Sequence, residues 1–495
     1  MFVVLIASGY KVLLVLKKYL IMREKILDIC KKKAFFIDKE SLELFSREKV
    51  ENFEIFISRI EKLVTSRTIK KEVFSIFSKE IKEIYGDFFE EKKVMNTEKV
   101  SVRSFLNNFR SRYDQIKKIL EEKGFDNLTS VRKINDGNST IIVSVFKKSI
   151  SRNKNIFFEV EDMSGRAVVF VNQFNINVFK KATDLLEDDI VALNVTCVKG
   201  RVFVNNIFYP DSFLKEKKFS KEDNYIAFCS DLHIGSKNFL ENRFLEFVKW
   251  INGEISGEED SGLKVKYLFF IGDNIDGTGH YSGQEKILKE KTPNEQYEKL
   301  AELLKLIRED VKIFICPGQH DAVWVGEVQN AIGKRWAKKL CEMPNVELVT
   351  NPAMVEVDGF KILMYHGASL NKFIDGISNI RVNYGHKFPT KVAIEILKRR
   401  HIVPMCGVMD YVPVEEDKLV IKDVPDIFAI GDQHRADVSL YNNILIIASS
   451  CWQSTTAFEE KIGNIPDPCK VPILNLKTRE IKIMDFSEEK NENSN

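Results

Sequence analysis

The spacing of apolar residues changes along the chain and divides it into three regions. From residue 22 to about residue 84, apolar positions recur every three or four residues, which predicts short amphipathic helices. Between residues 139 and 208, apolar and polar residues alternate over short segments bounded by turn residues, which predicts strands. From Tyr225 onward, short apolar runs alternate with helical segments such as 242–251 and 294–309, the pattern of a layered α/β fold.

The middle region has the strand order of a small barrel. A helix is predicted near 103–122, strands at 139–146, 155–162, 166–172, 190–198 and 201–208, and a short helix at 178–186. Three strands, a helix and two more strands match the order of an OB-fold barrel. Such barrels often stack the bases of single-stranded nucleic acid on aromatic side chains. We expect most of the aromatic residues here to fill the core instead: Phe157, Phe158, Phe170 and Phe203.

The length of 495 residues and these pattern changes predict several domains. The expected divisions are a helical module over 1–85, a linker and helix over 86–125, an OB-fold domain over 126–215, a layered α/β domain over 216–485, and a disordered tail over 486–495. Residues 1–21 are apolar but interrupted by Lys11, Lys17 and Lys18. We interpret them as a helical extension, or as an artefact of a start codon placed before Met22, rather than as a membrane anchor.

Composition narrows the class of protein only slightly. The net charge is +3, so a nucleic-acid partner would have to bind a local basic patch rather than a global positive field. The eight cysteines form no CxxC pair, and several stand inside apolar strands. Free buried thiols fit this usage better than disulfides or a zinc site, so we expect a cytoplasmic protein with no membrane association.

Polar clusters follow five of the predicted strands of the C-terminal region. The carboxyl ends of strands in open α/β sheets meet in one crevice, so clusters that span about two hundred residues can converge. The clusters contain Asp231 and His233; Asp273 and Asp276; Gln319, His320 and Asp321; His366; and Asp432 and His434.

Carboxylates and imidazoles without thiols suit divalent ions such as Mn²⁺, Mg²⁺, Fe²⁺ or Zn²⁺. A single histidine after a strand is more often a hydrogen-bonded loop residue than a ligand. Here four of the chain's seven histidines belong to these clusters, and a further one, His280, lies beside the second cluster. A carboxylate that bridges two ions is the arrangement of two-metal hydrolases, so the pattern predicts metal-assisted phosphoester hydrolysis.

The motif series DxH, GDxxD, G(N)HD, H and G(H)xH resembles the calcineurin-like metallophosphoesterases over residues 225–450. That resemblance implies a first metal held by Asp231, His233 and His434, with Asp273 bridging. It implies a second metal held by Asp273, His366, Gln319 and Asp432. His320 would protonate the leaving oxygen or stabilise charge in the transition state.

Two positions depart from the family pattern, and both belong to the second metal. Gln319 stands where the family has asparagine, which moves the amide oxygen by one methylene. Asp432 stands where the family has histidine, and it supplies a shorter, harder and negatively charged ligand. Such a site favours Mn²⁺ or Mg²⁺, binds its second ion weakly, or loses it.

A helical module, an OB fold and a phosphoesterase domain form the layout of DNA polymerase small subunits. Segments such as 403–434 and 467–478 resemble the small subunit of the archaeal two-subunit DNA polymerase, over about the last 370 residues. The resemblance implies a 3′→5′ exonuclease that acts on single-stranded DNA or frayed primer ends. It would proofread for a large catalytic subunit.

Three further residues are candidates for roles at or near the site. His280 could contact the substrate phosphate, and it is equally well explained as a loop residue that has no role at the site. Arg435 is a weaker candidate for contact with the DNA backbone. Trp452 is expected to be a packed aromatic residue rather than a DNA contact.

Two other functions stay open at this point. One is a scaffold subunit whose phosphoesterase site has decayed at Gln319 and Asp432, and the weaker one is a free-standing phosphatase.

Overall fold

The computed structural model describes residues 102–488 apart from 256–258, 282, 412, 457–458 and 461–463, and two short strands earlier in the chain. The chain divides into two compact units, Met1–Glu98 and Lys99–Asn495. In the first unit, β1 (Phe36–Ile37) pairs in parallel with β2 (Thr68–Ile69). The expected N-terminal helices, the extension over 1–21 and residues 489–495 of the tail predicted over 486–495 lie outside the described residues. Phe486, at the start of that predicted tail, is buried in the core. No described helix is long and apolar enough to cross a membrane.

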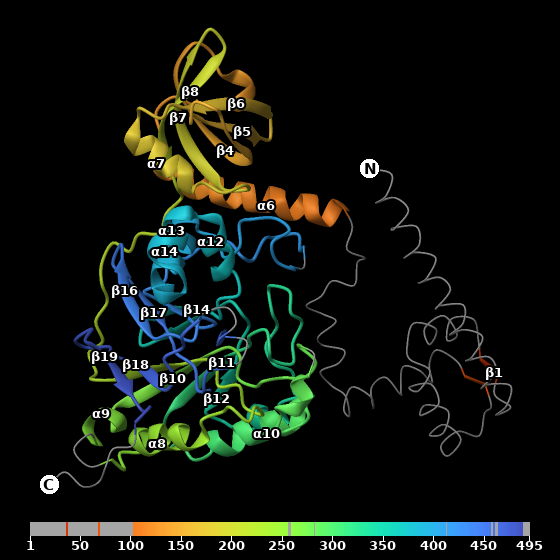
Figure 1. Cartoon of the computed structure of the whole chain (residues 1–495), viewed down its shortest axis with the longest axis vertical. Helices are drawn as coiled ribbons and strands as arrows, with labels where there is room; N and C mark the ends of the chain where they lie inside the picture. Colours follow the sequence, from red (N-terminus) through yellow and green to blue (C-terminus); the bar gives the residue numbers. More distant parts are fainter. Residues whose placement is uncertain are drawn as a thin grey trace. The chain divides into compact units, whose positions relative to one another are not determined.

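The second unit begins with helix α6 (Val102–Glu121), which was predicted near 103–122. Its apolar stripe, formed by Tyr113, Ile116 and Leu120, packs on strands of the barrel and on Val420 of the 404–424 segment. The hydroxyl of Tyr113 donates to the carbonyl of Ile142 at 2.8 Å. The helix therefore joins the barrel to a segment that is distant from it in the sequence (Figure 1).

A closed five-stranded barrel follows α6, with helix α7 after its third strand (Figure 1). The order β4-β5-β6-β8-β7 closes through pairing of β7 with β4. The elements are β3 (Leu128–Thr129), η1 (Val131–Lys133), β4 (Gly137–Ile150), β5 (Ile156–Asp162), β6 (Gly165–Val171), α7 (Ile176–Asp184), β7 (Ile190–Val198) and β8 (Arg201–Phe208). The predicted strands and helix are all present. Strand β4 is longer than predicted because it contacts two neighbours and continues past a bulge between Val145 and Lys147.

The expectation that aromatic residues mostly fill the barrel core was wrong for three of the four. Phe158 is fully buried among the core residues. Phe157, Phe170 and Phe203 lie on the outer face, and Phe203 keeps 40% of its surface exposed. Successive side chains of a strand point to opposite faces, so Phe157 and Phe158 cannot both point inward. On β6 and β8 the inward positions are taken by valines.

Two sheets form the layered part of the unit. The first has the order β12-β11-β10-β9-β18-β19 and the second β13-β14-β15-β17-β16. Apolar side chains from both sheets form one buried cluster, so the sheets pack face to face (Figure 1). The strands are β9 (Tyr225–Cys229), β10 (Val265–Ile271), β11 (Lys312–Cys316), β12 (Val346–Leu348), β13 (Ala353–Val357), β14 (Phe360–Tyr365), β15 (Ile427–Ile430), β16 (Asp437–Tyr441), β17 (Ile444–Ala448), β18 (Lys470–Asn475) and β19 (Ile481–Asp485).

Helices cover the outer face of each sheet, which gives four layers. The first sheet is covered by α8 (Glu241–Ile251), α9 (Glu259–Leu263), α10 (Pro293–Leu304) and α11 (Lys338–Cys341), with η2 (Gln284–Lys286) in a connection. The second is covered by α12 (Leu370–Gly376), α13 (Ser378–Asn383), η3 (Gly385–Lys387) and α14 (Pro389–Arg399). Helix α10 ends five residues before the predicted position, because residues 305–307 form tight turns that lead toward β11. The mixed α/β class predicted from the sequence is present.

Trp452 is a packed aromatic residue, as predicted. It is 1% exposed, and its ring contacts Phe244, Phe247 and Phe486 at centroid distances of 5.1, 5.4 and 6.4 Å. This cluster holds α8 against the segment that follows β17, next to the polar clusters at the strand ends.

Two buried ionic networks attach the barrel side of the unit to the layered part. Arg399 of α14 donates to Asp189 of the barrel at 2.8 Å and to Glu395 at 2.6 Å. Arg112 of α6 donates to Asp417 at 2.7 Å, and His401 lies 3.1 Å from the same carboxylate. A buried ion pair adds little to the free energy of unfolding, but an arrangement that separates its partners leaves an unpaired buried charge and is strongly destabilised. These networks therefore favour the one arrangement of the segments in which the charges meet.

The second network predicts a pH dependence of stability. Burial and the Arg112 guanidinium lower the pKa of His401 to about 4, despite the opposing pull of Asp417. The unfolded chain binds this proton near pH 6.5, so the contribution of His401 to stability is fully present above that pH and falls as pH decreases toward 4. We expect the folding equilibrium constant to fall by roughly a further tenfold per pH unit in that window.

Urea titrations at pH 7, 6 and 5 of the wild-type chain and of His401→Gln test this expectation. The variant is less stable at pH 7 but loses less stability on acidification. Parallel pH profiles for the two proteins would contradict the assignment.

Candidate metal centre

Strands of both sheets deliver the polar clusters to one edge of the fold. Asp231 and His233 follow β9, and Asp273 follows β10 of the first sheet. His366 follows β14 of the second sheet, and residues 432–434 follow β15. Five of these residues adopt left-handed backbone conformations, with φ between 46° and 66°: Asp231, His233, Asp273, Asp432 and His434. This conformation is unfavourable for residues with a Cβ, and non-glycine residues that adopt it cluster at functional sites.

Glycines let these loops approach one another closely. A Cβ at Gly431 would lie 2.0 Å from the hydroxyl of Ser230 and 2.9 Å from a carboxylate oxygen of Asp231. A Cβ at Gly318 would lie 2.2 Å from Oδ1 of Asp273. Both positions therefore exclude any other residue without movement of the site.

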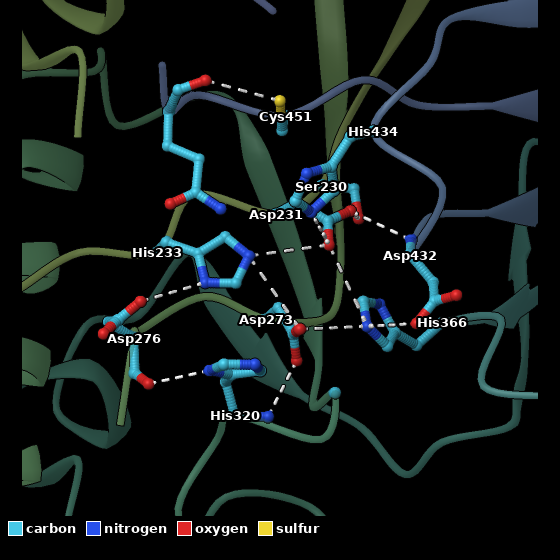
Figure 2. Close-up of polar contacts among 12 residues, drawn as sticks. Ser230, Asp231, His233, Asp273, Asp276, His320, His366, Asp432, His434 and Cys451 are labelled. Atoms are coloured by element: carbon cyan, nitrogen blue, oxygen red, sulfur yellow. Dashed lines mark hydrogen bonds and ion pairs between the residues drawn. The ribbon is translucent and has the colours of Figure 1, made fainter. Parts of the chain in front are cut away.

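Imidazole and carboxylate groups converge at this edge (Figure 2). Nε2 of His434 lies 3.3 Å from Oδ1 of Asp231, and Nε2 of His366 lies 3.3 Å from Oδ2 of Asp273. Nε2 of His233 lies 3.9 Å from both carboxylates. Three groups bring their ligand atoms within 4.8 Å of one another: Asp231, His233 and His434; His233, Asp273 and His320; and Asp231, Asp273 and His366.

Three of the four histidines are held through Nδ1 by a hydrogen bond to an oxygen, and the fourth, His233, only has a carboxylate near this atom. Nδ1 of His434 lies 2.5 Å from Glu459, whereas Nδ1 of His233 lies 3.4 Å from the Asp276 carboxylate and has no hydrogen-bond partner among the described residues. The other two are held by backbone carbonyls, with His366 at 2.7 Å from Ile271 and His320 at 2.8 Å from Asp276. An oxygen at Nδ1 favours the proton there and leaves the lone pair of Nε2 free. Metal-binding histidines are oriented in this way.

Several buried polar atoms at this edge have no hydrogen-bond partner in the described part of the chain. They are Oδ1 of Asp231, Nε2 of His233, Nε2 of His366 and Oε1 of Gln319. A buried polar atom without a partner is costly, so such atoms usually have a ligand. All four are atoms that coordinate divalent ions, and the donor set therefore fits a metal.

Electrostatics favour a cation at the same place. Burial would raise the pKa of Asp273, but the charges of His366 and His320 outweigh burial and hold this pKa well below its ordinary value. Burial would lower the pKa of His366, but Asp273 and Asp231 raise it well above its ordinary value. The carboxylates thus stabilise positive charge at the imidazoles, which is the charge that a divalent cation would supply.

The two residues that depart from the family pattern are both at this edge. Oδ1 of Asp432 lies 3.9 Å from Nε2 of His366, and Oδ2 accepts a hydrogen bond from Gln433 at 2.6 Å. The backbone amide of Asp432 donates to Asp231 at 3.0 Å. Gln319 lines a cavity of about 320 Å³, whose apolar wall includes Val325 and Met409.

His320 lies beside the cluster, and its backbone amide donates to Asp273 at 2.9 Å. The ring of His280 stacks on the ring of His320, with 4.5 Å between the centroids and 27° between the planes. The structure thus places His280 next to the metal-ligand candidates. Arg435 is held differently, since its guanidinium donates to the carbonyl of Ile465.

Sequence patterns assigned no role to three residues that position this site. Glu459 anchors His434 from a segment 25 residues later, where no motif marks it. Asp276 belongs to the GDxxD motif and was recognisable as a member of its cluster. Asp321 accepts hydrogen bonds from Asn274 at 2.9 Å and from Tyr297 at 2.8 Å, and so ties the β11 loop to the β10 loop and to α10.

The chain is similar to known proteins over the same region. Residues 226–438 match the family of the B subunits of DNA polymerases alpha and epsilon. The chain is 37% identical to the DNA polymerase II small subunit of Methanothermobacter thermautotrophicus, over 77% of this chain and 78% of the relative. It is 31% identical to that of Methanocaldococcus jannaschii, over 87% and 72% of the two chains.

It is 32% identical to the DNA polymerase II small subunit of Pyrococcus furiosus, over 78% of this chain, and it spans only 64% of that relative's length. A solved archaeal phosphodiesterase matches over 52% of this chain and 98% of its own, with 14% identity and a TM-score of 0.26, which is too low to support an argument. The family match over residues 226–438 includes the strand-end clusters, and the identities to these small subunits show that the chain belongs to the family of archaeal DNA polymerase II small subunits.

Proposed function

We propose that this chain is the small subunit of an archaeal two-subunit DNA polymerase and that it hydrolyses single-stranded DNA from the 3′ end. The observation that carries the hydrolytic part is the set of imidazole Nε2 and carboxylate oxygen atoms that converge without hydrogen-bond partners. The polymerase part rests on relatives that are named DNA polymerase II small subunit. That name implies a large catalytic partner, primer-template DNA as the common substrate, and the cytoplasm as the location.

The proposed centre holds two divalent ions, with Mn²⁺ or Mg²⁺ favoured. Asp231, His233 and His434 would hold the first ion, and Asp273 would bridge. The other side of Asp273 faces His366, with Nε2 at 3.3 Å, and there Gln319 and Asp432 would complete the second ligand set. When bound, divalent ions lower the pKa of water to near neutrality and neutralise charge on the phosphate.

His320 would donate a proton to the leaving oxygen. Water would release one proton to solvent, its oxygen would bond to phosphorus as the bond from phosphorus to the 3′ oxygen breaks, and that 3′ oxygen would take the proton from Nε2 of His320, which solvent then reprotonates. Burial lowers the pKa of His320, but Asp273 and the carbonyl of Asp276 outweigh burial and raise it. A raised pKa keeps the proton available at neutral pH. His280, stacked on this ring, would contact the substrate phosphate, and Arg435 would contact the DNA backbone.

The barrel and the domain boundaries complete the proposal. The closed order β4-β5-β6-β8-β7, with a helix between the third and fourth strands, supports an OB fold over 126–215. The two packed sheets support a calcineurin-like phosphoesterase domain over 216–485.

A second candidate is a scaffold subunit with a decayed centre. The observation that favours it is that Gln319 and Asp432, the two residues that depart from the family pattern, both belong to the proposed ligand set of the second ion. Asp432 already accepts a hydrogen bond from Gln433, and its pKa is raised by burial and, against the pull of His366, by Asp231 and Asp273. Such a carboxylate is a weaker ligand than the imidazole that the family pattern has at this position.

The first ion predicts a role for Glu459, which acts through His434. We expect Glu459→Gln to weaken Mn²⁺ binding by roughly 10- to 100-fold, because loss of the carboxylate frees the imidazole to rotate. Titration calorimetry of the chelator-treated chain measures this affinity. The matched control is Glu460→Gln, an exposed neighbour on the same short helix. Equal Mn²⁺ affinity in the Glu459→Gln and control variants would remove Glu459 from the site.

His320→Ala is expected to slow degradation of 3′-labelled single-stranded DNA in Mn²⁺ by at least about 100-fold, the usual contribution of a general acid. Asp273→Asn is expected to abolish the activity and to weaken metal binding, whereas His320→Ala keeps its metal. Lys237→Ala, an exposed substitution, serves as the control. Equal nuclease activity in all preparations would show that the activity does not arise from these residues.

The number of bound ions separates the two candidates. We expect two Mn²⁺ per wild-type chain at saturation, and Asp432→Ala to weaken only the second by at least about tenfold. Metal analysis after equilibrium dialysis gives both quantities. The scaffold candidate predicts instead at most one ion and no turnover in the wild type, and recovery of the second ion in Gln319→Asn/Asp432→His.

A further inference from the structure

Three phenylalanines form a row across the outer face of the barrel. Phe157 of β5 pairs with Phe170 of β6, which pairs with Phe203 of β8. The ring centroids are 4.9 Å apart for the first pair and 5.8 Å for the second. Phe203 is 40% exposed, and the other two are half-buried. Outward aromatic residues on three adjacent strands leave a contiguous apolar surface that a monomeric barrel has no need of.

Polar side chains continue the same row. Thr196 of β7 pairs with Phe203, and its hydroxyl donates to Asn138 of β4 at 2.6 Å. Asn205 of β8 donates to Thr196 at 2.7 Å. Asn138 and Asn205 are exposed and Thr196 is half-buried, and the two amides keep further hydrogen-bonding capacity for a ligand. The row therefore combines flat apolar rings with groups that can bind sugars or base edges.

Cations surround the row. Lys147 and Arg201 occupy the next outward positions on β4 and β8, with Glu159 on β5 between them. Arg152 and Lys154 lie in the turn from β4 to β5, and Lys199 in the turn from β7 to β8. All five basic side chains are exposed, and none forms an ion pair within the described residues. The Glu161–Arg166 ion pair lies further along the outward positions of β5 and β6, so six basic residues stand against two acidic ones and this face is positively charged.

We propose that this outer face of the barrel binds a single strand of DNA, with bases against the phenylalanines and phosphates against the surrounding cations. Aromatic platforms within a basic surface bind single strands with little sequence preference. The core of a protein–protein interface is instead depleted of charged residues. The proposal takes its class of ligand from the proposed function, but it concerns a site separate from the metal centre and needs no hydrolysis.

Binding of a fluorescein-labelled oligothymidylate to the full chain, followed by anisotropy in excess chelator, tests the proposal. We expect Phe170→Ala and Phe203→Ala each to weaken binding by about tenfold, the usual effect of losing one stacking residue. Phe203→Trp, which keeps an aromatic platform, retains the affinity to within about twofold. Phe219→Ala, in the segment between the barrel and β9, is the matched control because Phe219 is 61% exposed.

The salt dependence gives an independent readout. Each cation that contacts a phosphate contributes roughly 0.7 to the slope of log affinity against log salt concentration for single strands. We expect Lys199→Ala/Arg201→Ala to reduce the magnitude of this slope by about 1.4, from two lost cations, and to leave the secondary structure unchanged.

Unchanged affinity in the Phe170 and Phe203 variants would overturn the proposal, as would a wild-type chain that fails to bind the oligonucleotide. Variants that keep DNA affinity but no longer co-purify with the co-expressed polymerase large subunit would also overturn it and identify the face as a protein interface. The proposed function fails separately: a chain that binds the oligonucleotide in chelator but never cleaves it in Mn²⁺ supports this site and refutes the nuclease.

Discussion

Face-to-face packing of two sheets is the constraint on which the site depends. One buried apolar cluster contains side chains from both sheets, and it determines how β9 and β10 lie against β14 and β15. The ends of these strands then meet at one edge, where the loops bring buried carboxylates within 4 Å of imidazoles. Since the loops adopt left-handed conformations at non-glycine residues, the free energy that holds them there must come from the packed core rather than from local preference.

The histidines carry this constraint into the chemistry. Nδ1 of His434, His366 and His320 is hydrogen-bonded to an oxygen of Glu459, Ile271 and Asp276, which directs the Nε2 side of each ring toward the cluster around Asp231 and Asp273 (Figure 2). An arrangement anchored in this way loses little entropy when it takes up an ion. It is also sensitive to changes outside the ligand set, because Glu459 holds His434 from a segment that contributes no ligand itself.

The outer face of the barrel is not determined by core packing. Valines, other aliphatic residues and Phe158 fill the interior, so Phe157, Phe170 and Phe203 contribute little to the core. Their alignment across β5, β6 and β8 arises from strand register, which a one-residue shift would destroy by turning the rings inward. The position of the row thus depends on the β5–β6 and β6–β8 pairings that set this register. Buried contacts through Arg399 and Arg112 join the barrel side of the unit to the layered part.

The sequence by itself determined the order of elements and the identity of the clustered residues. Periodicity predicted the barrel strands and the helices, and the motifs marked Asp231, His233, Asp273, His366 and His434, because each motif is local and follows a strand directly. Only the tertiary structure decided which face each phenylalanine occupies, since alternation does not reveal which of two neighbouring residues points inward. It also supplied Glu459 as the anchor of His434, because this contact joins segments whose spacing carries no pattern. The geometry at Gln319 and Asp432 likewise depends on loops that two packed sheets position. Local sequence patterns do not specify the relative position of those loops.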